Sequence, residues 1–129
     1  MTQEEKQLLL KDLCARLPYG INVHHRGSIE EISEISPEGE FKNRRYDAWF
    51  GIETCKPYLR PMSSMTGAEV LEYISLKENI IAIDDITYYF ETYESIDWLN
   101  KHHFDYRGLI EKGLALKALE GMYELKKEN

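Results

Sequence analysis

The hydrophobic pattern changes period at Pro18 and Gly20, and this change constrains the fold class more than any other feature. Before it, leucines recur every three or four residues, which is the spacing of one helix face. After it, short runs alternate between apolar and polar residues, as in strands with one buried face. The sequence therefore predicts one helix followed by a sheet.

The boundaries of the first helix are marked by local sequence. Thr2 and Glu5 have the spacing of a capping box, in which each side chain accepts a hydrogen bond from the other's backbone amide. The proline at position 18 predicts an end near Ala15 or Arg16. The leucines between these ends predict a narrow apolar face that packs on a core.

Strands are expected from residue 21 onward. Residues 21–23 alternate, 26–27 favour a turn, and the pattern over 28–36 predicts a second strand, followed by a turn at 37–39. Isoleucines in the second strand recur every three residues instead of every two. A β-bulge and a short helical turn both explain that spacing.

The clearest alternation in the chain lies between Arg45 and Glu53. It predicts a strand whose core-facing residues are Tyr46, Ala48, Phe50 and Ile52. Arg45, Asp47 and Trp49 would then share the opposite face.

Further elements are expected in the second half of the chain. A Thr66–Glu69 capping box predicts the start of a helix that runs to about Lys77, followed by one or two strands within 79–93. Ser95 is expected to cap a helix over 96–103, and Asp105 a second helix over 106–112. A last strand is expected within 114–119. The fold class is therefore α+β, an N-terminal helix with an antiparallel sheet that could curl into a small barrel and short helices near the C-terminus. A chain of 129 residues with 43% hydrophobic content predicts a single domain, 1–129.

Several classes of protein are disfavoured by composition. The longest aliphatic run covers residues 80–83, far below the roughly 20 residues of a membrane span, so no membrane partner is expected. The polar, acidic start does not resemble a secretory signal. Cys14 and Cys55 allow at most one disulfide, so we expect a cytoplasmic protein whose two thiols are reduced, small and buried.

Catalytic and cofactor motifs are not found in the sequence. The two histidine pairs, 24–25 and 102–103, invite a metal hypothesis, but strand neighbours face opposite sides and helix neighbours diverge by about 100°. We therefore predict no catalytic residues, no metal, no cofactor and no enzymatic activity. One alternative stays open, a small hydrolase or metal enzyme whose site, such as one histidine of each pair with Asp105, has no linear motif. Cys55 would be the better cysteine nucleophile, without a local partner.

A basic, aromatic window between residues 41 and 60 is the best candidate for a binding surface. It carries a net charge of +3 in a chain of −7. Its predicted binding residues are Lys42, Arg44, Arg45, Trp49 and Arg60. An exposed tryptophan beside arginines can stack on a base or anchor a protein. The competing interpretation is that a helix covers Trp49 and that glutamates pair with the arginines.

Two functional hypotheses follow. The leading one is a non-enzymatic interaction or accessory module that binds a protein partner or itself, based on the missing catalytic motifs and the abundant tyrosine and tryptophan. The alternative is an accessory protein that binds nucleic acid through the 41–60 window. The net charge of −7 disfavours indiscriminate nucleic-acid binding.

Three blocks of sequence carry a family resemblance, LLLKDLCARLPYG (8–20), KPYLRPMSSMT (56–66) and DWLNKHHFDYRGLIEKGLAL (97–116). They resemble small uncharacterised proteins of gut anaerobic bacteria and their prophages or mobile elements, for which no activity is known. The resemblance implies a bacterial or phage cytoplasmic setting and a compact domain. It transfers no catalytic or binding residue.

Overall fold

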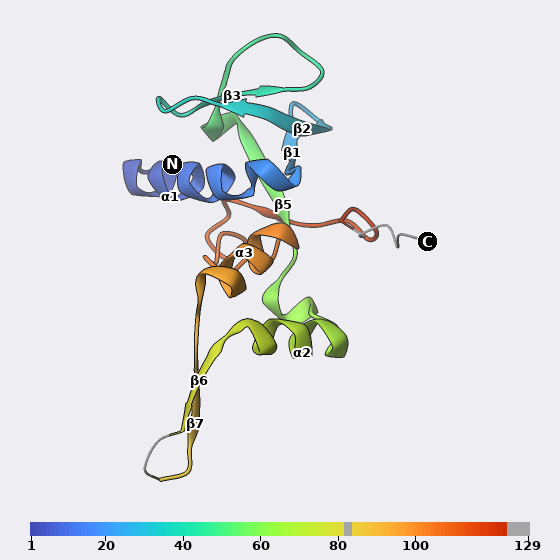
Figure 1. Ribbon diagram of the computed structural model, residues 1–129. Coiled ribbons are helices and arrows are strands. Elements are labelled where there is room, and N and C mark those ends of the chain that lie inside the picture. Colours follow the sequence, from blue (N-terminus) through green and yellow to red (C-terminus); the bar gives the residue numbers. More distant parts are fainter. Residues whose placement is uncertain (82–83, 124–129) are drawn as a thin grey trace.

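The computed structural model describes residues 1–81 and 84–123 and has the predicted α+β architecture (Figure 1). In chain order the elements are α1 (Gln3–Arg16), the 3-10 helix η1 (Leu17–Tyr19), β1 (Asn22–His25), β2 (Ser28–Ile35), β3 (Glu40–Asn43), β4 (Phe50–Gly51), η2 (Ile52–Thr54), β5 (Cys55–Leu59), η3 (Met62–Ser64), α2 (Gly67–Leu76), β6 (Glu78–Ile81), β7 (Thr87–Phe90), α3 (Tyr93–Lys101) and β8 (Leu116–Lys117).

Helix α1 begins and ends where local sequence predicts. The Thr2 hydroxyl accepts a hydrogen bond from the Glu5 amide at 3.0 Å, and the Glu5 carboxylate accepts one from the Thr2 amide at 2.9 Å. The helix ends at Arg16, and Pro18 lies within the following 3-10 helix. The predicted capping box and the predicted end are both confirmed, as is the second capping box, at the start of α2.

The main sheet has six strands in the order β4-β3-β2-β1-β5-β8, with β4 and β8 at its two edges. It is open, so the option of a small barrel is not realised. Every pairing is antiparallel except the last, in which β8 runs parallel to β5. The register between β2 and β3 shifts between Ile32 and Glu34, as at a β-bulge, which accounts for the three-residue spacing of Ile32 and Ile35. Ile29 precedes the shift and is exposed.

The strand predicted across residues 45–53 is wrong. Arg44–Trp49 form an exposed loop, and only Phe50–Gly51 pair in the sheet, as β4. The buried Asn43 side chain accepts hydrogen bonds from the amides of Arg45 and Tyr46, at 3.1 and 2.8 Å, and this turns the chain out of the sheet. Tyr46 and Ala48 are therefore exposed instead of facing the core.

The two helices predicted near the C-terminus also differ from the structure. Helix α3 begins three residues early, because Thr92 caps it. The Thr92 hydroxyl accepts a hydrogen bond from the Ser95 amide at 3.0 Å, and the Ser95 hydroxyl accepts one from the Thr92 amide at 2.7 Å. The helix predicted over 106–112 with Asp105 as its cap is wrong, because the segment is a series of turns in which Gly108 has a left-handed φ of 73°. The Asp105 carboxylate instead accepts hydrogen bonds within these turns, from the amides of Leu109 and Ile110 at 2.8 and 2.9 Å.

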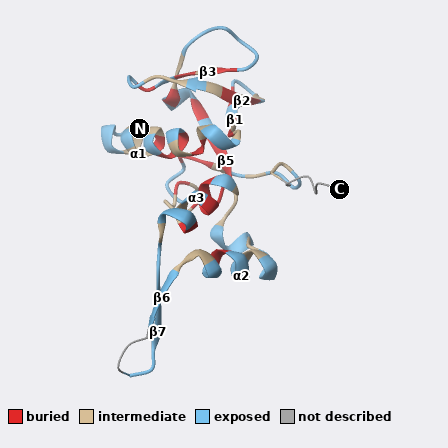
Figure 2. Ribbon diagram, in the orientation of Figure 1, coloured by how far each residue is buried: buried red, intermediate tan, exposed pale blue. Residues whose placement is uncertain are grey.

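Buried side chains form two clusters (Figure 2). The larger lies between α1 and the main sheet and is built from residues such as Leu9, Leu13 and Phe41. The smaller lies between α2 and α3, where the Trp98 ring stacks against Tyr73 at 5.5 Å and Phe104 at 5.6 Å. The α2·α3 unit is thus held by aromatic stacking next to the larger core.

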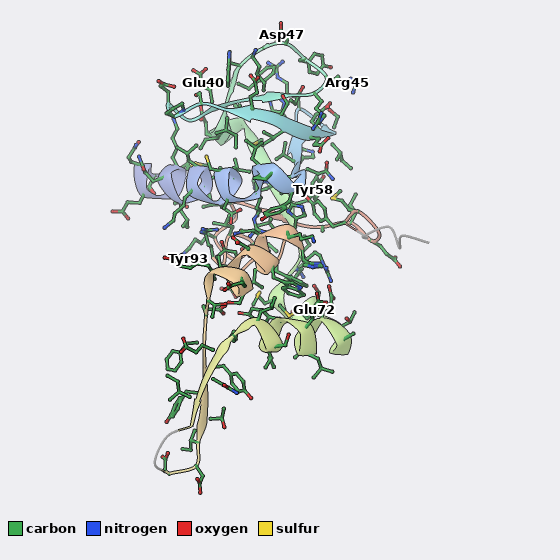
Figure 3. The ribbon with its side chains drawn as sticks, viewed as in Figure 1. Glu40, Arg45, Asp47, Tyr58, Glu72 and Tyr93 are labelled. Carbon is green, nitrogen blue, oxygen red and sulfur yellow. The ribbon has the colours of Figure 1, made fainter. Side chains whose placement is uncertain are left out.

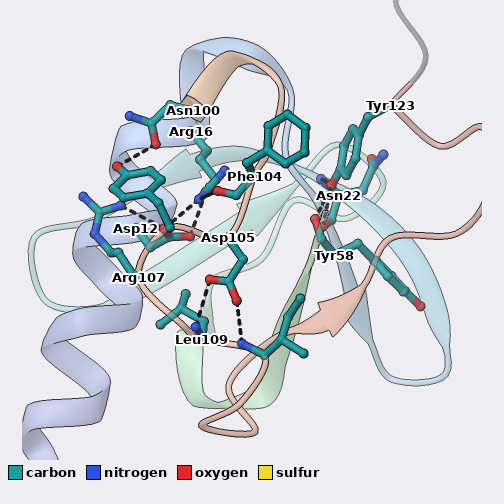
Figure 4. A network of polar contacts seen from close by, with 12 residues as sticks. Asp12, Arg16, Asn22, Tyr58, Asn100, Phe104, Asp105, Arg107, Leu109 and Tyr123 are labelled. Carbon is teal, nitrogen blue, oxygen red and sulfur yellow. Dashed lines mark hydrogen bonds and ion pairs between the residues drawn. The ribbon is translucent and has the colours of Figure 1, made fainter. Parts of the chain in front are cut away.

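A buried ion pair joins the first helix to the C-terminal segment (Figure 4). Arg16 donates two bonds to Asp12, at 2.9 and 3.1 Å, and a third to the Phe104 carbonyl oxygen at 2.6 Å. Arg107 donates to the same carboxylate at 2.9 Å. Asp12 and Arg16 are completely buried, so neither charge has access to water.

Replacing Asp12 by alanine is expected to destabilise the protein severely. Asp12→Ala leaves the buried guanidinium of Arg16 without its counter-charge, which costs about 3–5 kcal/mol of unfolding free energy. Urea unfolding followed by circular dichroism measures the loss. Asp47→Ala is the control, because Asp47 is 95% exposed and its pair with Lys42 should contribute less than about 1 kcal/mol. Equal, small losses for both variants would contradict the importance of the buried pair.

Candidate interaction surface

The five predicted binding residues do not form one patch. Lys42 lies on β3, and Arg44, Arg45 and Trp49 lie in or at the end of the loop that follows (Figure 3). Arg60 follows β5 and lies against Phe104 of the smaller core cluster. Its guanidinium forms a fork with the Glu69 carboxylate at 2.7 and 2.9 Å and lies 4.1 Å from the centre of the Phe104 ring.

The loop residues around Trp49 are largely neutralised. Trp49 itself is 44% exposed, so the interpretation that a helix covers it is wrong. The other half of that interpretation holds, because carboxylates pair with the bases. The pairs are Arg44–Glu31 at 2.6 Å, Arg45–Glu30 at 3.3 Å and Lys42–Asp47 at 3.0 Å. An anionic nucleic-acid backbone would therefore meet bases that already have partners.

The histidines of each pair point apart, on β1 as strand alternation predicts, and at 102–103 beyond the end of α3 instead of within a helix. On β1, His24 is exposed and His25 is buried against Phe41 and Phe50. His102 stacks near Trp98 at 4.3 Å, whereas His103 is buried beside Tyr123. Within residues 1–81 and 84–123, no three His, Cys, Asp or Glu side chains are grouped as metal ligands would be.

The cysteine and serine side chains that could act as nucleophiles lack the neighbours that would activate them among the described residues. Burial raises the pKa of Cys55 to about 12, so its thiol stays protonated at neutral pH and bonds to the Ile52 carbonyl oxygen at 3.3 Å. Cys14 is exposed, which corrects the expectation that both thiols are buried. A shallow pocket of about 180 Å³ is lined by His25 and Ser28, among others, but the Ser28 hydroxyl bonds to the His25 backbone oxygen and to Glu30 instead of an imidazole.

A large surface with no partner among the described residues lies on the hairpin of β6 and β7, whose described residues, 78–81 and 84–90, are here called the arm. The arm projects away from both cores (Figures 1 and 2). Its exposed apolar residues are Ile80 (50%), Ile86 (48%), Tyr88 (47%), Tyr89 (48%) and Phe90 (49%). All four residues of β7 are exposed, so neither face of this strand is covered by the rest of the described chain.

The register of the hairpin sorts these side chains between its faces. Ile80 pairs with Tyr88 and Glu78 with Phe90, so Ile80, Tyr88 and Phe90 share one face. Asn79 pairs with Tyr89 on the other face. The face that carries Ile80, Tyr88 and Phe90 is mostly apolar, with Glu78 beside Phe90 at its end.

Charge is concentrated around the arm. Residues 69–97 contain eight of the 23 acidic residues and one of the 16 basic ones, so this segment carries the whole net charge of −7 and the remaining chain is neutral. Six of the carboxylates are exposed and form no ion pair with a described residue. These are Glu72, Glu78, Asp84, Asp85, Glu94 and Asp97. Figure 3 labels Glu72 on the surface of α2.

Glu91 clamps the base of the arm to both flanking helices. Its carboxylate accepts hydrogen bonds from the Tyr73 hydroxyl on α2 and, at 2.7 Å, from the Ser95 hydroxyl on α3, and lies 3.2 Å from the Lys77 ammonium. Burial acts to raise the pKa of Glu91, but these three donors outweigh it and hold the pKa below its ordinary value. Burial and Glu91 together raise the pKa of Tyr73. These contacts hold the start of the arm against α2 and α3, which belong to the rest of the described chain, here called the body.

The sequence does contain signs of this surface. Thr87-Tyr88-Tyr89-Phe90 is strand-forming but does not alternate, which indicates apolar side chains on both faces. Its strand character was predicted, but its exposure was not. A run of this kind is also typical of a strand buried on both sides, and sequence cannot distinguish the two cases.

The buried His103 should make stability depend on pH. Burial lowers the pKa of His103 to about 4, whereas the unfolded chain binds this proton near 6.5. The unfolded state therefore holds more protons between these values, and stability falls as the pH drops from 6.5 towards 4. His103→Asn removes this contribution and tolerates the φ of 59°. Urea unfolding at pH 7 and pH 4 should show a loss roughly 2–3 kcal/mol smaller in the variant. Equal losses would contradict a neutral, buried His103.

Removing the clamp should loosen the arm without unfolding the body. Glu91→Ala leaves three donors without their acceptor, and the backbone amides of β6 and β7 should exchange with deuterium about tenfold faster or more. Hydrogen exchange resolved by residue is the measurement. The matched control is Glu94→Ala, because Glu94 is exposed in the first turn of α3 and should leave exchange unchanged. Equal rates in the two variants would show that Glu91 does not hold the arm.

Comparison of the chain with protein-family models, curated proteins and solved structures found no match. None of the helices in the described parts of the chain has the length and apolar character required to cross a membrane. The chemistry of the surface itself is therefore the basis on which a function can be proposed.

Proposed function

We propose that the protein is a non-enzymatic interaction module and that the arm is its contact surface for a protein partner. The observation that carries the proposal is the exposure of the whole of β7, which presents Tyr88, Tyr89 and Phe90 to solvent. Tyrosine and phenylalanine are enriched at protein interfaces, where they bury large areas at low cost in side-chain entropy.

An isolated hairpin of this kind leaves its apolar side chains exposed to water when the protein is a monomer, which gives it little stability. Two strands alone are marginally stable in water and usually need a third strand or a packed face. Grouped apolar side chains that are exposed to solvent commonly mark an interaction site. A partner that covers the face of Ile80, Tyr88 and Phe90 would supply the missing packing.

The surface extends beyond the hairpin. Tyr93 follows β7 at the start of α3 and is 92% exposed. Leu71, on the helix that leads into β6, is 73% exposed, and Val70 and Ile74 are each 37% exposed. A partner that contacts the arm near its base could also bury these side chains.

The proposal is tested by removing the aromatic rings while keeping strand-forming residues. The double variant Tyr88→Thr/Phe90→Thr should capture less of each protein that binds through the arm, because threonine keeps strand propensity but removes most of the apolar area. Affinity capture from a bacterial lysate with wild-type and variant baits, with light scattering for self-association, measures the effect. We expect at least a tenfold loss of each arm-dependent partner, equal to about 1.4 kcal/mol.

The matched control is Tyr46→Thr/Trp49→Thr, which removes two aromatic rings of similar exposure from the loop of the 41–60 window. Capture should survive in this variant. If capture is lost there and kept in the arm variant, the 41–60 window is the binding surface. If the wild-type protein is monomeric and captures nothing, the interaction function is wrong.

A further inference from the structure

Building on the proposed function, we propose that the arm binds an extended segment of a basic protein. The segment adds as a third strand along the free edge of β7, and its Lys or Arg side chains lie beside the carboxylates that surround the arm. The proposal thus names both the mode of binding and the chemistry of the partner.

The free edge of β7 supports strand addition. β7 has β6 as its one neighbour in a two-stranded sheet, so its other edge has backbone amides and carbonyls that pair with no described strand. Soluble proteins commonly protect such edges with lysine, proline, inward-pointing charges or a bulge. Thr87-Tyr88-Tyr89-Phe90 contains no charge and no proline. An edge of this kind is suited to an extended peptide, whose main chain supplies the hydrogen bonds.

The side chains on β7 define which segment fits. Tyr88 and Phe90 share the apolar face with Ile80, whereas Tyr89 lies opposite. An added strand places its alternate residues on those two faces. The side chains beside Tyr88 and Phe90 should therefore be apolar.

The charges identify the partner as basic and disfavour a second copy of this chain. Asp84 and Asp85 precede β7, and Glu91 and Glu94 follow it. If β7 of a second copy paired antiparallel with β7, each pair of aspartates would lie near the other copy's glutamates, and like charges would repel. Lysine or arginine at the ends of the added strand would instead meet carboxylates at both ends.

The partner chemistry can be tested by selection from a library of short displayed peptides of random sequence, with the full-length protein as bait. We expect enriched peptides with alternating apolar residues flanked by Lys or Arg. Their binding should weaken as salt rises, and hydrogen exchange should show protection of the β7 amides.

Local charge is tested with the quadruple variant Glu78→Gln/Asp84→Asn/Asp85→Asn/Glu94→Gln, which keeps the aromatic residues. Asparagine tolerates the left-handed φ of 59° at position 85. Enriched peptides should bind about tenfold more weakly, since exposed charge pairs each contribute a few tenths to one kcal/mol.

The matched control changes net charge equally but away from the arm, by replacing the exposed Glu4, Glu38, Glu40 and Glu111 with Gln. Unchanged binding of the enriched peptides would assign the effect to the arm. Equal weakening in both variants, enrichment of peptides without basic residues, or protection away from β7 would overturn the proposal. So would self-association through β7. One of these overturning results can occur while lysate capture still depends on Tyr88 and Phe90. In that case the basic-peptide proposal is wrong, and the proposed interaction function of the arm is kept.

Discussion

The buried pair of Asp12 and Arg16 connects parts of the chain that are far apart in sequence. Arg16 donates to Asp12 within α1 and to the Phe104 carbonyl oxygen, which lies 88 residues further along the chain. Phe104 belongs to the smaller aromatic cluster, whereas α1 packs on the larger core. A single guanidinium therefore links the two cores. A charge placed there without water requires that its partners be present together, so both clusters depend on the same contact.

The arm follows a different physical logic from the body. The body buries its apolar residues in two clusters, and its net charge is zero once residues 69–97 are set aside. The arm exposes its apolar residues and lies in the segment that carries the net charge of −7. Buried cores and exposed apolar side chains are thus separated in space, with the Glu91 clamp at the boundary. A substitution on the exposed side of the arm should therefore have little effect on either core.

The elements governed by neighbouring residues could be predicted. The capping boxes at Thr2 and Thr66 and the end of α1 depend on contacts within a few residues, and the structure has them all. The spacing of isoleucines in β2 left a bulge and a helical turn open, and pairing with β3 decides for a register shift. The strand predicted over 45–53 failed because the side chain of Asn43, outside that window, turns the backbone at its start. Alternation in the loop has no structural consequence, because both sets of side chains face water.

In the candidate site, too, residue type could be predicted from the sequence, whereas exposure and pairing could not. The sequence predicted the binding surface in the 41–60 window, whereas the structure leaves the aromatic residues of the arm exposed as well. Lys42, Arg44 and Arg45 have partners on neighbouring strands or in the loop, and Arg60 lies against Phe104 of the smaller core cluster. These pairings depend on how strands align, which composition does not contain. The strand-forming run at 87–90 was visible in the sequence, but not its exposure.

The amino-acid sequence by itself determined the fold class, the starts of α1 and α2 and the segregation of charge, since each follows from residue pattern, local hydrogen bonding or residue identity. Tertiary structure alone decided which side chains are covered. A strand that is apolar on both faces is equally suited to a buried core and to an exposed hairpin, because the backbone geometry is the same in both. Only the placement of β6 and β7 away from both cores made Tyr88, Tyr89 and Phe90 a surface.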